Sequence, residues 1–274
     1  MKENIIRALS GIVYIILLVS ATLFSRYTFL FLFGAFMLIA VIEFCKLISY
    51  NYIIPIIVAA IVYTITVLFT EHVPVFLNLF IALSLGVNIL LLYQLFSIGQ
   101  IRPLTNFRKS LKLAGYIIIP FVLLSQLPFV KWYTGSYAYF PEIVIFTFIM
   151  IWTNDTFAYL VGKSIGKHKL FERISPKKTV EGFLGGLVFT VIGAFIISHY
   201  QKLFPAVHLI ASAVILVIFG SLGDLVESRF KRLAGVKDSG TIMPGHGGIL
   251  DRLDSVIFAI PFLFLYYQII NYVS

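Results

Sequence analysis

Two carboxylates in the last third of the sequence lie at the ends of long apolar runs. Asp224 lies just beyond the run 206–222, and Asp251 lies just before the run 254–272. A carboxylate at such a boundary is costly unless it is paired or binds a cation. If the two runs form a helical hairpin, both carboxylates come together, and their hard oxygens suit Mg²⁺ bound to the phosphates of a substrate. We therefore expect Asp224 and Asp251 to be metal ligands.

Polar residues after the run 206–222 have helical spacing. If the helix continues past its glycines, Asp224, Glu227, Ser228 and Lys231 fall at i, i+3, i+4 and i+7, on one face. A solvated amphipathic helix end is the alternative interpretation. Ser228, Lys231 and the neighbouring Arg232 are candidates for contact with substrate phosphates.

A glycine-rich segment, 244–248, connects this helix to the last apolar run. Its glycines permit positive φ angles and a close approach of backbone N–H groups to an anion, although such turns are common. In the next segment, Asp251 and Asp254 are at i and i+3, and helix capping explains one of them but not both. The candidate residues of this region are Lys237, Asp238, His246, Gly247, Gly248 and Arg252.

The segment 175–182 is a second candidate phosphate site. Ser175 at the N-cap and Pro176 at the first helical position predict that a helix begins here. Lys177 and Lys178 would then oppose the helix dipole, which favours an anion at this end, with Thr179 beside it. The alternative is that the lysines only set membrane topology.

Two further carboxylates lie inside apolar runs. Asp155, in the run 141–161, is a functional candidate, with Asn154 or a loop lysine as its expected partner. Glu43 is interpreted as a side chain that reaches the interface or pairs with Lys46, with a functional role as the less favoured alternative.

Composition defines the elements that must position these residues. The chain has 274 residues, of which 60% are hydrophobic and 12% charged, and its mean hydropathy is +0.99. These values exclude an ordinary soluble protein. A lone Cys45 excludes intrachain disulfides and zinc clusters. We predict an all-α polytopic membrane bundle of about nine helices, a single domain 1–274 with N-terminal spans in 1–140 and catalytic motifs in 141–274. The expected spans are 8–24, 27–48, 53–69, 73–96, 113–130, 141–161, 183–200, 206–222 and 254–272.

The basic residues predict an orientation. Of the 21 lysines and arginines, 18 fall in alternate segments between the predicted spans. This asymmetry places the N-terminus and the candidate loops in the cytoplasm and the C-terminus outside. It also accounts for the net charge of +9 without nucleic acid as a partner. The short N-terminus favours a bacterial cytoplasmic membrane.

The residues 228–254 resemble the signature of the phosphatidate cytidylyltransferases, also called CDP-diacylglycerol synthases. The resemblance rests on Ser228 to Arg232, on Lys237-Asp238, and on the segment from Pro244 to Asp254. Met243 is a conservative departure from the usual Leu, Ile or Phe. Weaker likeness extends over about 150–260, whereas 1–140 is similar only in hydropathy.

This resemblance implies the reaction of CTP with phosphatidic acid to give CDP-diacylglycerol and pyrophosphate. It also implies Mg²⁺ on Asp224 and Asp251, a possible role for K⁺, and a homodimer. Lys237 and His246 complete the expected catalytic group, with His246 as a donor to a phosphate oxygen rather than a general base. The expected substrate contacts are Asp155, Ser175, Lys177, Lys178, Thr179, Ser228, Lys231, Arg232, Asp238, Gly247, Gly248 and Arg252.

Two other functions remain open. A CTP-dependent polyprenol or phytol kinase would need the same membrane access, metal and CTP, but it would transfer the γ-phosphoryl group. A transporter would use the intramembrane Asp155 in an ion pathway. The charged motifs gather at one membrane face, and the sequence shows no inverted repeat, which disfavours the transporter.

Overall fold

Apolar helices form nearly all of the structure, a computed structural model that describes residues 2–68, 74–97, 104–129, 138–201 and 204–273. The fifth helical segment is continuous but changes its winding along its length. The helical elements are α1 (Lys2–Phe24), α2 (Arg26–Leu47), α3 (Ile53–Leu68), α4 (Pro74–Phe96), α5 (Asn106–Leu113), the π-helical η2 (Ala114–Ile118), α6 (Ile119–Gln126), the 3₁₀ turn η3 (Leu127–Phe129), α7 (Pro141–Ile165), α8 (Val180–Tyr200), α9 (Ala206–Leu233) and α10 (Leu250–Val273).

The lengths of these helices confirm the expected class, an all-α polytopic membrane bundle. Within the described residues, eight helical segments are long and apolar enough to cross a membrane, with 106–129 counted as one segment. The expected span 53–69 corresponds to α3, which is apolar but has only 16 residues. At 1.5 Å per residue α3 is about 24 Å long, somewhat shorter than the hydrocarbon core of a typical bilayer.

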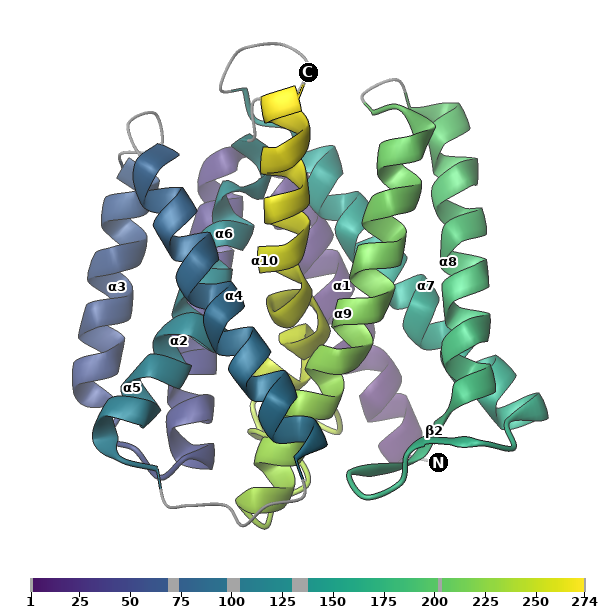
Figure 1. Ribbon diagram of the computed structural model, residues 1–274, viewed down its shortest axis with the longest axis horizontal. Coiled ribbons are helices and arrows are strands. Elements are labelled where there is room, and N and C mark those ends of the chain that lie inside the picture. The colour runs from purple at the N-terminus through teal and green to yellow at the C-terminus, as the bar shows by residue number, and fades with distance from the viewer. Residues whose placement is uncertain (1, 69–73, 98–103, 130–137, 202–203, 274) are drawn as a thin grey trace.

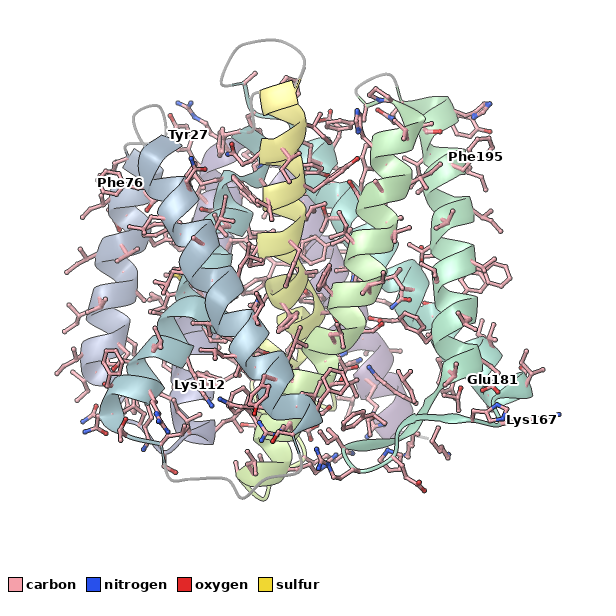
Figure 2. All side chains as sticks on the ribbon, viewed as in Figure 1. Tyr27, Phe76, Lys112, Lys167, Glu181 and Phe195 are labelled. Carbon is pink, nitrogen blue, oxygen red and sulfur yellow. The ribbon has the colours of Figure 1, made fainter. Side chains whose placement is uncertain are left out.

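The outer surface of the bundle is apolar at the level of the helices. Large side chains such as Tyr27, Phe76 and Phe195 are at least half exposed. In Figure 2 these three lie toward one end or along the side, whereas Lys112, Lys167 and Glu181 lie at the opposite end. An apolar belt with charged groups beyond it is the surface expected of helices in lipid.

Aromatic side chains fill the core between α2, α9 and α10. The ring of Phe44 packs edge to face on Phe230 at 5.0 Å, and Tyr116 lies 5.9 Å from the same ring. Phe258 of α10 packs on Tyr116 from the other side, at 6.3 Å. Phe230 is adjacent to Lys231 on α9. This aromatic cluster therefore fixes the end of α9 relative to α2 and α10.

The segments that carry the candidate residues gather at one end of the bundle. Figure 1 shows the N-terminal end of α1, the β-hairpin between α7 and α8, and the connection from α9 to α10 at the same end, and the C-terminus at the other. This arrangement agrees with an odd number of crossings. It also places the loops 162–182 and 223–253 on the same side of the bundle.

The predicted helix start at Ser175 is wrong. Residues Ser175–Thr179 form strand β2, which pairs antiparallel with β1 (Lys169–Phe171), and α8 begins only at Val180. Thr179 is the N-cap, because its hydroxyl accepts a hydrogen bond of 3.1 Å from the backbone N–H of Gly182. Pro176 is tolerated in a two-stranded hairpin, where every residue is on an edge strand. The lysines therefore precede α8, and the helix-dipole argument for an anion fails.

The expected continuation of the eighth span is confirmed. The helix α9 runs through Gly220 and Gly223 to Leu233, a length of 28 residues. This corresponds to about 42 Å, so α9 extends beyond a hydrocarbon core of about 30 Å. Gly223 is required by close packing, since a Cβ atom there would lie 2.5 Å from Cβ of Phe258. The polar face of α9 is thus carried past the membrane boundary beside the start of α10.

Candidate active site

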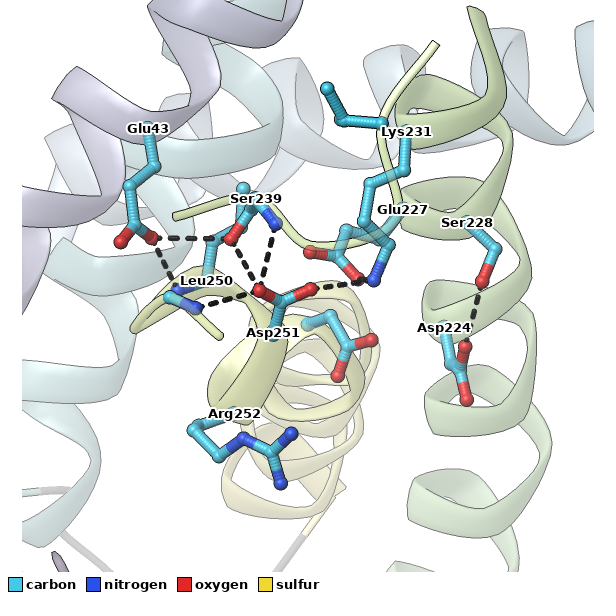
Figure 3. Close-up of polar contacts among 12 residues, drawn as sticks. Glu43, Asp224, Glu227, Ser228, Lys231, Ser239, Leu250, Asp251 and Arg252 are labelled. Atoms are coloured by element: carbon cyan, nitrogen blue, oxygen red, sulfur yellow. Dashed lines mark hydrogen bonds and ion pairs between the residues drawn. The ribbon is translucent and has the colours of Figure 1, made fainter. Parts of the chain in front are cut away.

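Asp251, in the first turn of α10, is the centre of the polar network (Figure 3). Its Oδ1 accepts a hydrogen bond of 2.6 Å from Nζ of Lys231 on α9. Its Oδ2 accepts from the backbone N–H and the hydroxyl of Ser239, both at 2.8 Å, and from the N–H of Gly248 at 2.7 Å. One carboxylate therefore joins α9, the connection after it and α10.

Asp224 lies on the same face of α9 as Lys231, but its partners differ from those of Asp251. It forms an ion pair with Lys178 of β2 and accepts a hydrogen bond of 3.1 Å from the hydroxyl of Ser228. Burial disfavours the Lys178 ammonium, but attraction to Asp224 outweighs this effect and raises the pKa of Lys178 above its usual value. The hairpin thus brings a firmly cationic lysine to the carboxylate, as a phosphate-binding residue requires.

Glu227 and Lys231 form a buried ion pair one helical turn further along α9. Their Oε2 and Nζ atoms are 2.5 Å apart, and Glu227 is fully buried. Its other oxygen, Oε1, is buried with no hydrogen-bond partner among the described residues. Asp254, only 8% exposed, lies near enough to interact electrostatically with Asp224 and Lys231. Carboxylates outnumber the cations paired with them here, which favours an additional cation.

The donor chemistry of this cluster fits a hard metal ion. Within the described part of the chain, no group of three or more His, Cys, Asp or Glu side chains is arranged as a metal site. However, Asp224 and Asp251 are each neutralised by an ammonium group, and Glu227 has an unpartnered buried oxygen. Carboxylate oxygens that already favour cations are the ligands that Mg²⁺ prefers. The residues therefore fit the metal that the sequence predicts, without showing it.

The glycine-rich segment has the backbone conformations that were expected. Gly245 and Gly247 have φ angles of +74° and +85°. A Cβ atom on Gly247 would lie 2.5 Å from Oδ2 of Asp251, so the turn also needs glycine for close approach. Because Gly248 donates its N–H to that same carboxylate, this segment positions Asp251 rather than leaving all its amide groups open to an anion.

His246 projects from this turn toward α1. Its Nδ1 lies 2.7 Å from the hydroxyl of Ser10, and the backbone oxygen of His246 accepts a hydrogen bond of 2.9 Å from Arg252. Burial, together with repulsion from Arg252 and Arg7, lowers the pKa of His246 below its usual value. A neutral imidazole at this place can donate a hydrogen bond from its free nitrogen.

A cavity of about 210 Å³ lies beside this network, between α1, α7 and α10. Its lining includes polar side chains, such as Asp155, Asp251 and Arg252, and apolar side chains, such as Phe148 and Trp152. The Nδ2 group of Asn154 donates to Asp155 at 3.4 Å, which confirms the expected partner. The cavity therefore presents charge and apolar surface to the same ligand.

Glu43 of α2 is the largest omission from the expected site. It is 5% exposed and accepts hydrogen bonds from the N–H groups of Ile249 and Leu250, at 3.1 and 2.8 Å, and from the hydroxyl of Ser239. The interpretation that it reaches the interface is therefore wrong, because it is buried under the start of α10. Its position in an apolar run was the available signal; its partners, about 200 residues away, gave none.

The remaining predicted residues are less closely connected to the network. Arg232 is exposed and donates to the backbone oxygen of Val236 at the end of α9. Thr179 is buried as the N-cap of α8. On β2, Lys177 is exposed and Ser175 is partly buried. Lys237 and Asp238 are exposed in the connection between α9 and α10. Their contact with substrate remains a prediction.

This chain matches a family model over most of its length and known proteins over less than half of it. The model of the cytidylyltransferase family matches residues 5–270, including the N-terminal helices. A phosphatidate cytidylyltransferase of Bacillus subtilis (strain 168) is 52% identical over 122 residues, which are 44% of this chain and 45% of that protein. Proteins of the same name from Staphylococcus saprophyticus and Staphylococcus aureus (strain COL) are each 52% identical over 121 residues, 44% of this chain and 46% of theirs. The aligned part spans less than half of each relative.

Proposed function

Since this chain belongs to the cytidylyltransferase family, we propose that it is an integral membrane enzyme that converts CTP and phosphatidic acid to CDP-diacylglycerol and pyrophosphate. The observation that carries this proposal is the cavity between α1, α7 and α10, where Asp251 and Arg252 face apolar side chains. A lipid phosphate and a nucleotide phosphate can meet at such a place. The proteins similar to this chain bear the name of the same activity.

The reaction requires no protein nucleophile. An oxygen of the lipid phosphate forms a bond to the α-phosphorus of CTP, and the bond from this phosphorus to the oxygen of the β-phosphate breaks. Pyrophosphate leaves with the electron pair of that bond. The protein must then align the two phosphates and neutralise their charge. The cations available for this task are Lys178 and Lys231, each held on a carboxylate, and Arg252 on the cavity wall.

We propose Mg²⁺ as the cofactor, with Asp224 and Asp251 as its ligands. When bound, it would neutralise charge on the phosphates and on the leaving pyrophosphate. The proposal is supported by the donor chemistry of the two carboxylates and by the unpartnered oxygen of Glu227. A supporting role of K⁺ is a further proposal, which substitution of K⁺ by Na⁺ in the assay would test.

Isotope placement tests the proposed reaction against its alternatives. The purified protein is incubated with phosphatidic acid vesicles, Mg²⁺ and CTP labelled at either the α- or the γ-phosphorus. We expect α-label in the lipid fraction and γ-label in pyrophosphate. Transfer of γ-label to a prenol would indicate the lipid kinase. Absence of label from any lipid would contradict both enzymes and favour transport.

We propose that the N-terminus and the site face the cytoplasm of a bacterium and that the C-terminus lies outside. The proposal is supported by the distribution of the basic residues. In a Cys45→Ala background, a cysteine at the exposed position Tyr200 should react with an impermeant thiol reagent in intact cells. A cysteine at Lys169, at the other end of the bundle, should react only after lysis. The reverse pattern would overturn the orientation.

We also propose a homodimer, which the resemblance of residues 228–254 implies. Mass measurement of the purified protein in detergent, at several concentrations, tests it. A mass of two chains is expected, and a monomer at all concentrations would contradict it.

A further inference from the structure

The tyrosine of α1 that faces the cavity has no role in the network described above. Tyr14 is only 7% exposed, and its hydroxyl is buried with no hydrogen-bond partner among the described residues. A buried hydroxyl without a partner costs free energy, so it is normally paired. Its ring is held by stacking on Phe36, with centroids 6.1 Å apart, and this packing does not need the hydroxyl.

The surroundings of Tyr14 indicate what its hydroxyl meets. Tyr14 lines the cavity together with Arg252, His246 and Asp254. The side chain of Arg252 donates one hydrogen bond, to the backbone oxygen of His246, and has no ion pair among the residues that the structure describes. A hydroxyl donor and an uncommitted guanidinium on one cavity form the donor set for a phosphate.

The cavity favours the phosphate of a lipid over that of a nucleotide. At about 210 Å³ it is smaller than the roughly 300–1,000 Å³ that encloses a drug-sized ligand. It can therefore enclose a phosphate and its glycerol, whereas a whole nucleoside triphosphate would extend beyond it. Ile15 of α1 and Phe148 and Trp152 of α7 supply an apolar wall next to the polar groups, as an amphiphile requires.

We propose that Tyr14 and Arg252 form the subsite for the phosphate monoester of the lipid substrate, with the Tyr14 hydroxyl donating to a phosphate oxygen. This inference rests on the proposed function and names where its lipid is bound. The helix α1 then forms a wall of the active site. The contact between Ser10 and His246 connects α1 to the glycine-rich segment 244–248.

The test is the variant Tyr14→Phe, which removes only the unpartnered hydroxyl. We expect the KM for phosphatidic acid at saturating CTP to rise about 10-fold, the effect of losing one hydrogen bond to a charged group. The KM for CTP should stay within about 2-fold of wild type. The melting temperature in detergent should be unchanged or higher, because no protein hydrogen bond is lost. An unchanged KM for the lipid, a rise for CTP alone, or a lower melting temperature would each overturn the subsite.

Tyr139→Phe is the matched control. Its hydroxyl donates to the backbone oxygen of Thr22 at 2.6 Å, outside the cavity lining. This variant should lower the melting temperature and leave both KM values unchanged.

Direct binding separates this inference from the proposed reaction. Phosphatidic acid, but not phosphatidylcholine, which lacks a monoester, should raise the melting temperature of wild type without CTP. If Tyr14→Phe loses this shift while wild type transfers no α-label, the subsite stands and the proposed reaction fails. If α-label is transferred but the shift does not depend on Tyr14, the reaction stands and the subsite fails.

Discussion

The two halves of this protein contribute polar groups to the site in different ways. In α9 and α10, charged residues occur together at helical spacing and neutralise one another, as Lys231 does between Glu227 and Asp251. In α1 and α2, single polar residues such as Tyr14 and Glu43 lie among apolar neighbours and reach toward the C-terminal half. The charged residues of α9 and α10 can bind a charged ligand. The polar residues of α1 and α2 support these residues or line the cavity beside them. The residues of such a site can therefore be recognised from the sequence of the C-terminal half, whereas the sequence of the N-terminal half gives little indication of them.

The largest effect is expected for Asp224, the proposed metal ligand on the charged face of α9. Asp224→Asn should reduce the rate of α-label transfer by at least about 10³, on the order of 4 kcal/mol, because it removes a charge from the proposed Mg²⁺ site. Glu227→Gln changes a residue one turn away that forms an ion pair with Lys231 and is not a proposed metal ligand, so this variant should retain measurable activity. Initial rates across a Mg²⁺ titration measure both. Equal losses would show that the ligand is misassigned.

Glu43 tests whether the N-terminal half supports the site. Glu43→Ala leaves two backbone N–H groups without their acceptor and removes one of the two acceptors of the Ser239 hydroxyl. We expect a loss of roughly 2–3 kcal/mol in unfolding free energy and a fall in kcat of about 10- to 100-fold, since Asp251 shares Ser239 as a donor. Unfolding and kcat are both measured in detergent.

The exposed Glu142 of α7 provides the control, because Glu142→Gln should change neither quantity. If Glu43→Ala has the stability and kcat of wild type, α2 does not support the site.

The sequence predicted the parts of the structure that have a repeating signal. Nine apolar runs give the positions of the helices, although the helices that contain the runs 8–24, 113–130 and 206–222 extend 6 to 11 residues beyond them. The spacing of Asp224, Glu227 and Lys231 gives the polar face of α9. The partners of Glu43 could not be predicted, since they depend on packing across about 200 residues. The hairpin was missed because Ser175-Pro176 and Thr179 offer two competing helix starts, and only the paired strands decide between them.

His246 lies where the two halves meet, and its protonation tests that contact. Its lowered pKa keeps the imidazole neutral at pH values below its usual pKa of about 6.5. Folding stability from this residue is therefore fully present above that pH and is lost as the pH falls through the lowered value. In His246→Gln this loss on the acid side should disappear. Its activity near neutral pH should fall about 10-fold, because a donor to phosphate is displaced. Melting temperature and rate from pH 5 to 8 test this; an unchanged acid limb would contradict it.

The smallest expected effect distinguishes the observed start of α8 from the one that the sequence predicted. Thr179→Ala removes the acceptor of the Gly182 N–H and should cost about 1 kcal/mol of stability, the usual value of an N-cap. Ser175→Ala, on the strand, should change stability by less than about 0.5 kcal/mol. Because neither hydroxyl is assigned to the reaction by its contacts, both variants should keep a near-normal kcat. A larger loss of stability for Ser175→Ala would favour a helix that begins at Ser175. Lys177 and Lys178 would then oppose the helix dipole, which would again favour a bound phosphate at this end.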